Sequence, residues 1–408
     1  MNDKNRKMKT IIQNTSRKTI VLFLAVFALV SCSKDSHIDP DQDMGCDVIE
    51  EFVNTAVRIS EPTTWTADRV YLFKSSIVVI ESELTIEPGT VMKFDSGSSI
   101  TVRKGMKGGR IIANGTADKR IVFTSYADNT HCGNTLGEGS GSQAKRGDWG
   151  GINIDAGNNH SFTYVDVLYA GGSAGEGSYS AIEFNYEAGD DFTFDHCVVA
   201  HTRGEVRGSN KEEYKDPNSP GIYAAFEATF QQILPNPEKI RFTNNVFYNN
   251  DVPLMINLHI PVDASNKFHN PDNPSETNDR NVIHIFDWVH QEADATWGHT
   301  EVPYAYTGGN QHVADVRHTI TIGPNVIVKF PGVATGINGW DDIRVINLHP
   351  TAILTSYHDD VHGGDSNGNG AATSPSKGDW AGFVVRMSSG QRDNIWVTGD
   401  NILYANRP

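Results

Sequence analysis

The sequence predicts an all-β fold in which short strands form coils stacked along one axis. Three observations lead to this prediction: the composition, an eleven-residue phrase that occurs twice, and a looser pattern that recurs between the two copies. The 408 residues include 38 glycines, and short runs of Val, Ile, Thr, Phe and Tyr end at Gly, Asn, Asp or Pro. Such runs are typical of strands and turns, and no long helical pattern interrupts them.

The repeated phrase predicts a strand, a tight corner and a second strand. Its copies are "LTIEPGTVMKF" at residues 84–94 and "ITIGPNVIVKF" at residues 320–330. Pro88 suits the first central position of a turn, and Gly89 suits the following position, which needs a positive φ. Asn325 replaces the glycine in the second copy and is the next-best residue there. The repetition therefore indicates architecture rather than an activity.

The similarity between the copies extends beyond this phrase and defines two modules, at about residues 61–170 and 294–406. The middle section carries a finer pattern of short strands with Asn at the corners. Such units predict coils that bury their inward side chains only when neighbouring coils cover them. Asn tolerates left-handed backbone at corners and can stack in ladders. The matching segments are "IVFTSYAD" (121–128) with "AILTSYHD" (352–359), "KRGDWGGINI" (145–154) with "SKGDWAGFVV" (376–385), and "FTFDHCVVAHT" (192–202) with "IRFTNNVFYNN" (240–250).

These phrases carry a family resemblance. "TTWTADRVYLFKSSIVVIESELTIEPGTVMKF", followed by "GDWGGI", resembles the bacterial, Bacteroidota-type right-handed parallel β-helix lipoproteins, which share the pectin-lyase-like fold. The resemblance implies a single-stranded right-handed parallel β-helix with loop insertions over residues 61–408. Residues 32–60 are then expected to be a tether and an N-terminal cap. The fold hosts lyases, hydrolases and adhesins, so it implies no single reaction.

The N-terminus predicts export and lipidation. A basic stretch precedes the apolar run "TIVLFLAVFALV", which ends in "LVSC" and is too short to span a bilayer comfortably. The last four residues resemble the bacterial lipoprotein box, which makes residues 1–31 the signal peptide and Cys32 the lipidated residue. An ordinary signal peptide with an incidental cysteine is the alternative. We expect an outer-membrane lipoprotein of the cell envelope, attached to the membrane through Cys32, with exposure at the cell surface as a further expectation.

The net charge bears on which partners are expected, and the number of cysteines bears on which disulfides can form. The formal net charge is −16 and no basic stripe is visible, so nucleic acid is not expected as a partner. Beyond Cys32 the chain has Cys46, Cys132 and Cys197, and an odd number leaves at least one thiol unpaired. Which two of them pair stays open.

The segment "HDDVHGGDSNGNG", residues 358–370, is the candidate cation site. Its second half matches the first half of the calcium-loop pattern D-x-[DN]-x-[DN]-G. The twelfth loop position is Ser376 rather than Glu, so the helix–loop–helix calcium motif is not expected. Similar insertions before "GDW" occur in the family, and the resemblance therefore implies Ca²⁺. A solvated loop of Asx turns stays open as the alternative. The predicted ligands are Asp359, Asp360, Asp365, Asn367 and Asn369.

No strong catalytic constellation is visible. Acids and bases gather at "GDD" (189–191) and "HCVVAHTRGEVR" (196–207), and a polysaccharide-cleaving site needs such groups on one face. Trp149 and Trp380 of the two "GDW" phrases are interpreted as structural rather than as sugar platforms. We expect a non-catalytic module that binds a glycan or another macromolecule, or that acts as a scaffold. A polysaccharide lyase or glycoside hydrolase working in a groove along the β-helix is the alternative. The weak catalytic candidates are Asp190, Asp191, His201 and Arg203.

Overall fold

The computed structural model describes most of the chain after residue 45. Residues 44–408 form one compact unit. Residues 1–43, which hold the predicted signal peptide and Cys32, lie outside the described residues. Within the described residues, no helix is long and apolar enough to cross a membrane. The described residues are 46–408 except 106–107, 134, 136–142, 173–179, 189–190, 205–222, 229–236, 287–293, 307–313, 317–318, 331, 333–335, 341–345, 387–394 and 407–408.

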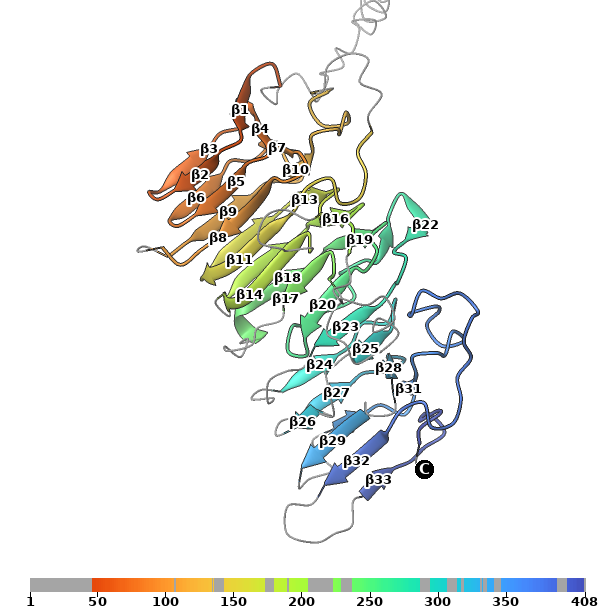
Figure 1. Cartoon of the computed structure of the whole chain (residues 1–408). Helices are drawn as coiled ribbons and strands as arrows, with labels where there is room; N and C mark the ends of the chain where they lie inside the picture. The colour runs from red at the N-terminus through yellow and green to blue at the C-terminus, as the bar shows by residue number, and fades with distance from the viewer. Residues whose placement is uncertain are drawn as a thin grey trace, which may run out of the picture. The chain divides into compact units, whose positions relative to one another are not determined.

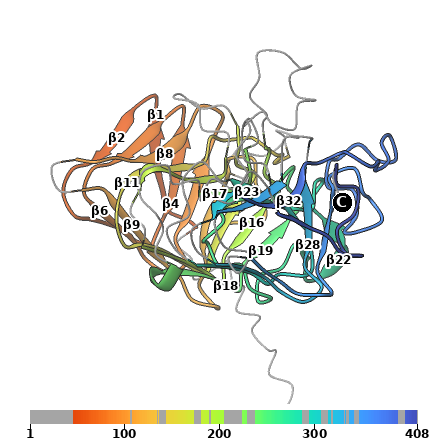
Figure 2. The same ribbon diagram turned by 90° about the horizontal axis from the view of Figure 1, so that it is seen from below.

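The fold is a parallel β-helix, as the sequence predicts. The chain passes from one sheet to the next, and each strand pairs in parallel with the strand one coil later, as β1 (Ile49–Val53) does with β4 (Val70–Lys74) and β4 with β7 (Val91–Phe94). Figure 1 shows the strands of each sheet side by side, and the turned view in Figure 2 shows the curved path of the chain around the coils. Parallel pairing therefore already begins at Ile49, inside the segment expected to be tether and cap.

Two sheets begin together at the N-terminal end and differ in length. The seven-stranded sheet ends in the middle of the chain, whereas the eleven-stranded sheet continues into the second module. After β1, β4 and β7, the seven-stranded sheet contains β10 (Ile121–Ser125), β13 (Val165–Leu168), β16 (Val198–Ala200) and β19 (Val246–Tyr248). The eleven-stranded sheet contains β2 (Ala56–Ile59), β5 (Ile77–Ile80), β8 (Ser99–Val102), β11 (Ile152–Gly157), β14 (Ile182–Ala188), β17 (Phe226–Ala228), β20 (Leu254–Asn257), β23 (Ile283–Phe286), β25 (Tyr304–Tyr306), β28 (Ile327–Phe330) and β31 (Ile353–Ser356).

The remaining sheets complete the coils. A six-stranded sheet contains strands of the first module and the middle section, and three- and four-stranded sheets contain strands of the second module. Among the described strands, only β21 with β22 and β32 with β33 pair antiparallel. The six strands are β3 (Thr63–Trp65), β6 (Glu83–Ile86), β9 (Arg110–Asn114), β12 (His160–Thr163), β15 (Phe192–Asp195) and β18 (Ile240–Thr243), and the 3₁₀ turn η3 (Pro237–Lys239) precedes β18. The others are β24 (Ala295–Trp297), β27 (Ile320–Ile322) and β30 (Ile346–Leu348), then β26 (Ala314–Val316), β29 (Gly336–Trp340), β32 (Gly382–Arg386) and β33 (Ile395–Val397), and the pair β21 (His269–Asn270) and β22 (Asn273–Thr277).

The two modules use different sheets for the same phrase. The strand "VMKF" of the first copy is β7 in the seven-stranded sheet, whereas "IVKF" of the second copy is β28 in the eleven-stranded sheet. The change occurs after β19 and β20, where the chain forms the antiparallel pair β21–β22 before it returns to the eleven-stranded sheet as β23. The modules are thus alike in local structure but occupy different sides of the stack.

Stacked aromatic rings fill the interior. Phe73 and Phe94 of adjacent strands lie 4.8 Å apart between ring centroids, and Trp149 stacks on Phe94 at 4.4 Å. In the second module Trp380 stacks on Phe330 at 4.3 Å. Each fully buried side chain of this size contributes about 1.5–3 kcal/mol. The interior of the coils is therefore a packed core and not a channel.

Corners form ladders, as the recurring Asn positions predict. In the middle coils a single left-handed residue turns the chain at each corner, and the next residue is buried. Asn250 shows how a ladder is joined: its Oδ1 accepts from Thr202 N at 3.0 Å, and its Nδ2 donates to Asn278 Oδ1 at 2.9 Å. The left-handed corner residues are Tyr164, His196 and Asn244 on one line and Tyr169, His201 and Asn249 on the other.

Candidate functional site

Each module has one long loop, which follows the strand that ends in "TS" downstream of the repeated phrase. The first loop, residues 126–151, joins β10 to β11, and the second loop, residues 357–381, joins β31 to β32. The first loop covers an apolar cluster on the outer side of the seven-stranded sheet, where its Tyr126 and Cys132 pack. The apolar residues beneath it are Val70, Leu72, Val91, Val122, Leu168 and Ala200.

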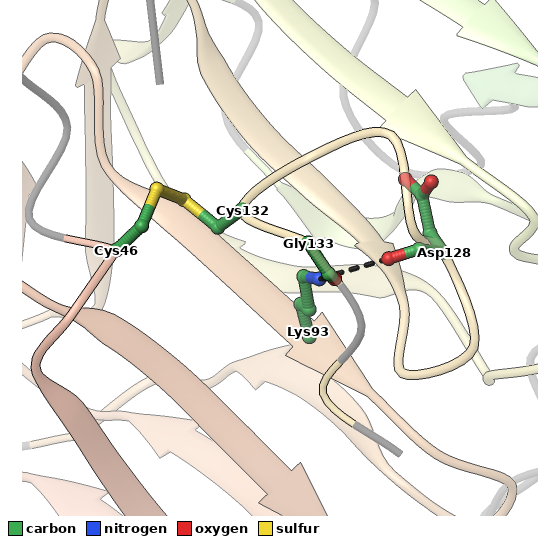
Figure 3. Close-up of a disulfide and its surroundings, with 5 residues drawn as sticks. All are labelled: Cys46, Lys93, Asp128, Cys132 and Gly133. Atoms are coloured by element: carbon green, nitrogen blue, oxygen red, sulfur yellow. Dashed lines mark hydrogen bonds between the residues drawn. A yellow bond between two sulfur atoms is a disulfide. The ribbon is translucent and has the colours of Figure 1, made fainter. Parts of the chain in front are cut away.

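A buried lysine closes each loop. Lys93 Nζ donates to Asp128 O at 2.8 Å and to Gly133 O at 2.9 Å (Figure 3). Lys329 Nζ repeats the arrangement in the second loop, with Asp359 O at 2.8 Å and Gly364 O at 2.5 Å. Both lysines are fully buried. A buried ammonium group is stable only where such acceptors surround it, so these contacts fix the loop conformation.

Burial changes the acidity of the second lysine. Desolvation lowers the pKa of Lys329 to about 8, although the negative charges of Asp359, Asp360 and Asp365 oppose the shift. The charged form is therefore disfavoured by its surroundings more than it is supported by the nearby acids.

The aspartate beside each lysine holds a histidine. Burial of the Asp128 carboxyl raises its pKa, but hydrogen bonds from His131 and Thr124 outweigh this, and the net pKa lies below its usual range. The distances to Asp128 Oδ2 are 2.7 Å from His131 Nδ1 and 2.6 Å from Thr124 Oγ1. The second loop repeats both distances, and the pKa of its aspartate is lowered for the same reasons; its residues are Asp359, His362 and Thr355.

The "GDW" phrases close the loops from the other end, and both tryptophans are structural as predicted. Trp149 and Trp380 are fully buried. Trp149 Nε1 donates to Leu168 O at 2.8 Å, and Trp380 Nε1 donates to Leu403 O at 2.7 Å. Their rings stack on core aromatic residues and offer no exposed face to a sugar.

The predicted calcium residues lie in the second loop, where the loop itself donates to oxygens of Asp359, Asp365 and Asn367. Asp365 Oδ1 accepts from Gly368 N at 2.8 Å, and Asp365 Oδ2 accepts from Gly370 N at 2.7 Å. Asn367 Oδ1 accepts from Asn369 N at 3.2 Å. The carboxylate of Asp359 is turned toward His362 and Thr355, whereas one oxygen of Asp360 is buried without a hydrogen-bond partner.

These contacts describe a loop of Asx turns closed by its own backbone. Among the described residues, no group of three or more His, Cys, Asp or Glu side chains could hold a metal ion. These hydrogen bonds do not test Ca²⁺ binding, because a carboxylate oxygen of Asp365 that accepts a backbone N–H keeps a lone pair for a cation. Calcium binding by this loop stays a prediction.

The weak catalytic candidates do not form one cluster. Asp191 precedes β15, where its Oδ1 accepts from Asn159 N at 2.9 Å, whereas His201 follows β16 at another corner. Arg203 N donates to Ala170 O at 2.9 Å in the same stretch as His201. Asp190 lies outside the described residues. Of the three candidates that the structure describes, His201 and Arg203 thus lie in one stretch, whereas Asp191 lies at another corner.

His201 is part of a corner ladder. Its ring stacks on Tyr169 at 5.1 Å and meets Tyr248 edge-on at 5.3 Å, and Asn249 Nδ2 lies 2.7 Å from its Nδ1. Burial, with a contribution from the charge of Arg146, lowers the pKa of His201. Because the rings stack on one another along the ladder, their faces are covered, which argues against a sugar-stacking role.

Sequence reasoning missed Arg146 of the first loop. Its Nη1 lies 2.5 Å from Asp251 Oδ1 and 2.6 Å from Asp279 Oδ2, and its Nη2 donates to Asn249 Oδ1. The arginine therefore ties the first loop to coils more than a hundred residues later. No signal in the "KRGDW" phrase points to these partners, since the second copy has Lys377 at the same position.

A pair of glutamates on adjacent strands was also missed. Glu183 of β14 and Glu227 of β17 are direct neighbours in the register of the eleven-stranded sheet. Glu227 is buried, and its Oε2 accepts from Ser180 Oγ at 2.8 Å. A signal for them exists, because "AIE" (181–183) and "AFE" (225–227) each place an acid inside an apolar strand.

The three cysteines that the structure describes form one disulfide and leave one free thiol. Cys46 pairs with Cys132 of the first loop (Figure 3), and Cys197 is buried and free. Burial raises the pKa of the Cys197 thiol to about 12, which leaves it unreactive.

In comparisons with known proteins, no family model, no curated protein and no solved structure matches this chain. The site is therefore interpreted from its geometry.

Proposed function

We propose that this protein is a lipid-anchored β-helix of the bacterial cell envelope that displays a binding surface for a glycan or another macromolecule. The signal peptide would end at residue 31, and acylated Cys32 would hold the chain to the outer membrane. The lipoprotein-like "LVSC" supports the anchor, and the rigid stack supports display.

One observation carries the binding proposal: long connections leave from the same corner of successive coils. The connections 126–151, 169–181 and 201–225 each run from the seven-stranded to the eleven-stranded sheet. Loops held by a rigid scaffold are where binding residues usually lie. The buried lysines, aspartates and tryptophans of the two loops serve structure, so the ligand is expected to meet the outer loop residues.

The binding test uses the purified chain and a panel of uronate-containing and neutral glycans. We expect saturable binding without new reducing ends or unsaturated products, and replacement of residues 205–222 by a short Gly-Ser linker should weaken it at least about tenfold, or 1.4 kcal/mol. Asp118→Ala, an exposed change at a different corner, is the control. Equal binding by the linker variant and the parent would contradict the proposal.

The anchor has a separate test. Incorporation of an alkyne-labelled fatty acid in cells should occur in the parent chain and be lost in Cys32→Ala, which should also leave the membrane fraction. Labelling that persists in Cys32→Ala would refute acylation at this residue.

One specific observation favours glycoside hydrolysis as a second candidate function. Neighbouring strands in a sheet lie about 4.8 Å apart, so the carboxyl groups of Glu183 and Glu227 can approach the roughly 5 Å separation used by retaining glycosidases. New reducing ends that vanish in both Glu183→Gln and Glu227→Gln would establish this activity. Absence of turnover on the whole panel would exclude it for those glycans.

A further inference from the structure

The disulfide joins the entry of the chain into the β-helix to the first loop. Cys46 precedes β1 directly, and Cys132 lies 86 residues later, so the cross-link encloses β1 to β10. Figure 3 shows the bridge beside the loop that Lys93 holds.

The second loop serves as an internal comparison, because it has the same closure without a disulfide. Gly363 occupies the position of Cys132, and both residues have positive φ, 78° and 53° respectively. Lys329 and His362 hold the second loop as Lys93 and His131 hold the first. The cross-link is therefore not required for the loop conformation, and a non-glycine residue at such a φ costs about 1 kcal/mol. What the disulfide adds is the connection to Cys46.

That connection lies at the N-terminal end of the stack, where edge strands can be pulled away from their neighbours. β1, β2 and β3 are the edge strands of their sheets at the N-terminal end. Val48, Ile49 and Val53, on or next to β1, are about half exposed. A pull on the chain before β1 would separate such an edge strand from β4 one hydrogen bond at a time, which requires little force compared with simultaneous rupture.

We propose that the Cys46–Cys132 disulfide is a mechanical clamp that keeps tension on the N-terminal segment from unzipping the first coils. Tension arriving at Cys46 passes through the sulfur atoms to Cys132, so the edge strand β1 is left out of the path. The membrane anchor would be the source of this tension, and to that extent the inference rests on the proposed function.

The first loop is built to receive this tension on both sides. Lys93 holds it to the seven-stranded sheet within the enclosed coils. Arg146 holds its other end to Asp251 and Asp279, in coils beyond the enclosed segment. The load is thus shared by ion pairs and hydrogen bonds on both sides of β10 rather than by one edge strand.

The test is single-molecule pulling on the whole exported chain, with one handle before Cys46 and the other after Pro408. In the oxidised parent we expect no early low-force steps from the N-terminal coils. The final extension should fall short by about 300 Å, since 86 residues extend by roughly 3.3–3.6 Å each.

The matched variant is Cys46→Ser with Cys132→Gly, which installs the residue that the second loop uses at this position. It should show early low-force steps that begin at β1, whereas steps from the second module stay unchanged. Reduction of the parent with a phosphine in the same instrument is the second measurement and should produce the same early steps even if the double variant folds poorly.

An identical force for the first unfolding event in oxidised and reduced parent would overturn the clamp. The pulling experiment uses purified protein and needs no acyl group, so its outcome is separate from the test of Cys32.

Discussion

Lys93 and Lys329 occupy equivalent positions in the two modules, and each donates to the backbone carbonyls at the two corresponding positions of its own loop. The acceptors are Asp128 O and Gly133 O in one case, and Asp359 O and Gly364 O in the other. The duplication thus includes the closure of the loops as well as the strands, although β7 and β28 belong to different sheets. A loop that carries its own cation at its centre is positioned by the scaffold before any ligand arrives.

Removal of the Lys329 ammonium group should open the second loop. Lys329→Met keeps much of the side-chain volume but leaves the carbonyl oxygens of Asp359 and Gly364 without this donor. We expect a loss of about 1–3 kcal/mol in the free energy of unfolding, because buried acceptors lose their partner. Hydrogen exchange should become faster between residues 358 and 364.

The control for this change is Lys377→Met, which removes an exposed lysine from the same loop. Its free energy of unfolding should stay within about 0.5 kcal/mol of that of the parent. Its hydrogen-exchange pattern should be unchanged. Equal effects of the two substitutions would mean that the buried contacts of Lys329 contribute nothing specific.

Stability should rise with pH in the alkaline range because of Lys329. Its pKa is about 8 in the folded protein and about 10.4 in the unfolded chain, so the unfolded state binds more protons between these values. The free energy of unfolding therefore increases as pH rises from 8 to 10.4, by up to about 3 kcal/mol from this group.

Urea unfolding of parent and Lys329→Met at several pH values isolates this contribution, since other titrating groups are common to both proteins. The difference in stability between them should change by a large part of that amount across the window. A difference that is constant with pH would show that the lysine is not shifted.

The spacing of residues that are close in sequence was sufficient to predict much of this fold. The Pro-Gly and Pro-Asn corners, the burial of Trp149 and Trp380, and the Asn ladders follow from residues that are neighbours in sequence or one coil apart. The change of sheet between β7 and β28 could not be predicted, because it depends on how β21 and β22 interrupt the stack.

The same limit applies to the candidate site. Alternation at Asp365, Asn367 and Asn369 suggests convergent oxygens, but the sequence does not show that backbone amides of the loop donate to the oxygens of Asp365 and Asn367. Arg146 finds its partners more than a hundred residues away, which no local pattern encodes. Glu183 and Glu227, by contrast, could have been found, because each is an acid inside an apolar strand.

The second loop should fold without calcium. The Lys329 ammonium already binds carbonyl oxygens of the loop, and Asp365 already accepts backbone donors. The melting temperature in chelator should lie within about 1 °C of that in calcium, which for a chain of this size corresponds to about 0.8 kcal/mol. Asp365→Ala should lower the melting temperature equally in both conditions.

A calcium effect would have a distinct signature. If calcium raised the melting temperature of the parent by several degrees and had no effect on Asp365→Ala, the loop would be a calcium site and the hydrogen-bonded arrangement described above would be its metal-free form. Differential scanning fluorimetry in matched buffers is sufficient for this comparison.

Gly89 is a position where backbone strain alone decides the effect of substitution. Its φ is +91°, and an added Cβ would meet no atom closer than 3.7 Å, so Gly89→Ala introduces no clash. We expect a destabilisation of about 1 kcal/mol, because left-handed backbone disfavours a side chain. Gly89→Asn should cost less, since Asn325 adopts φ of 60° at the same corner of the second module.

Gly298→Ala, where the space is open and φ is not positive, is the control and should be close to neutral. Urea unfolding followed by tryptophan fluorescence ranks the three variants, and a Gly89→Ala protein as stable as Gly298→Ala would show that this corner does not require a left-handed residue.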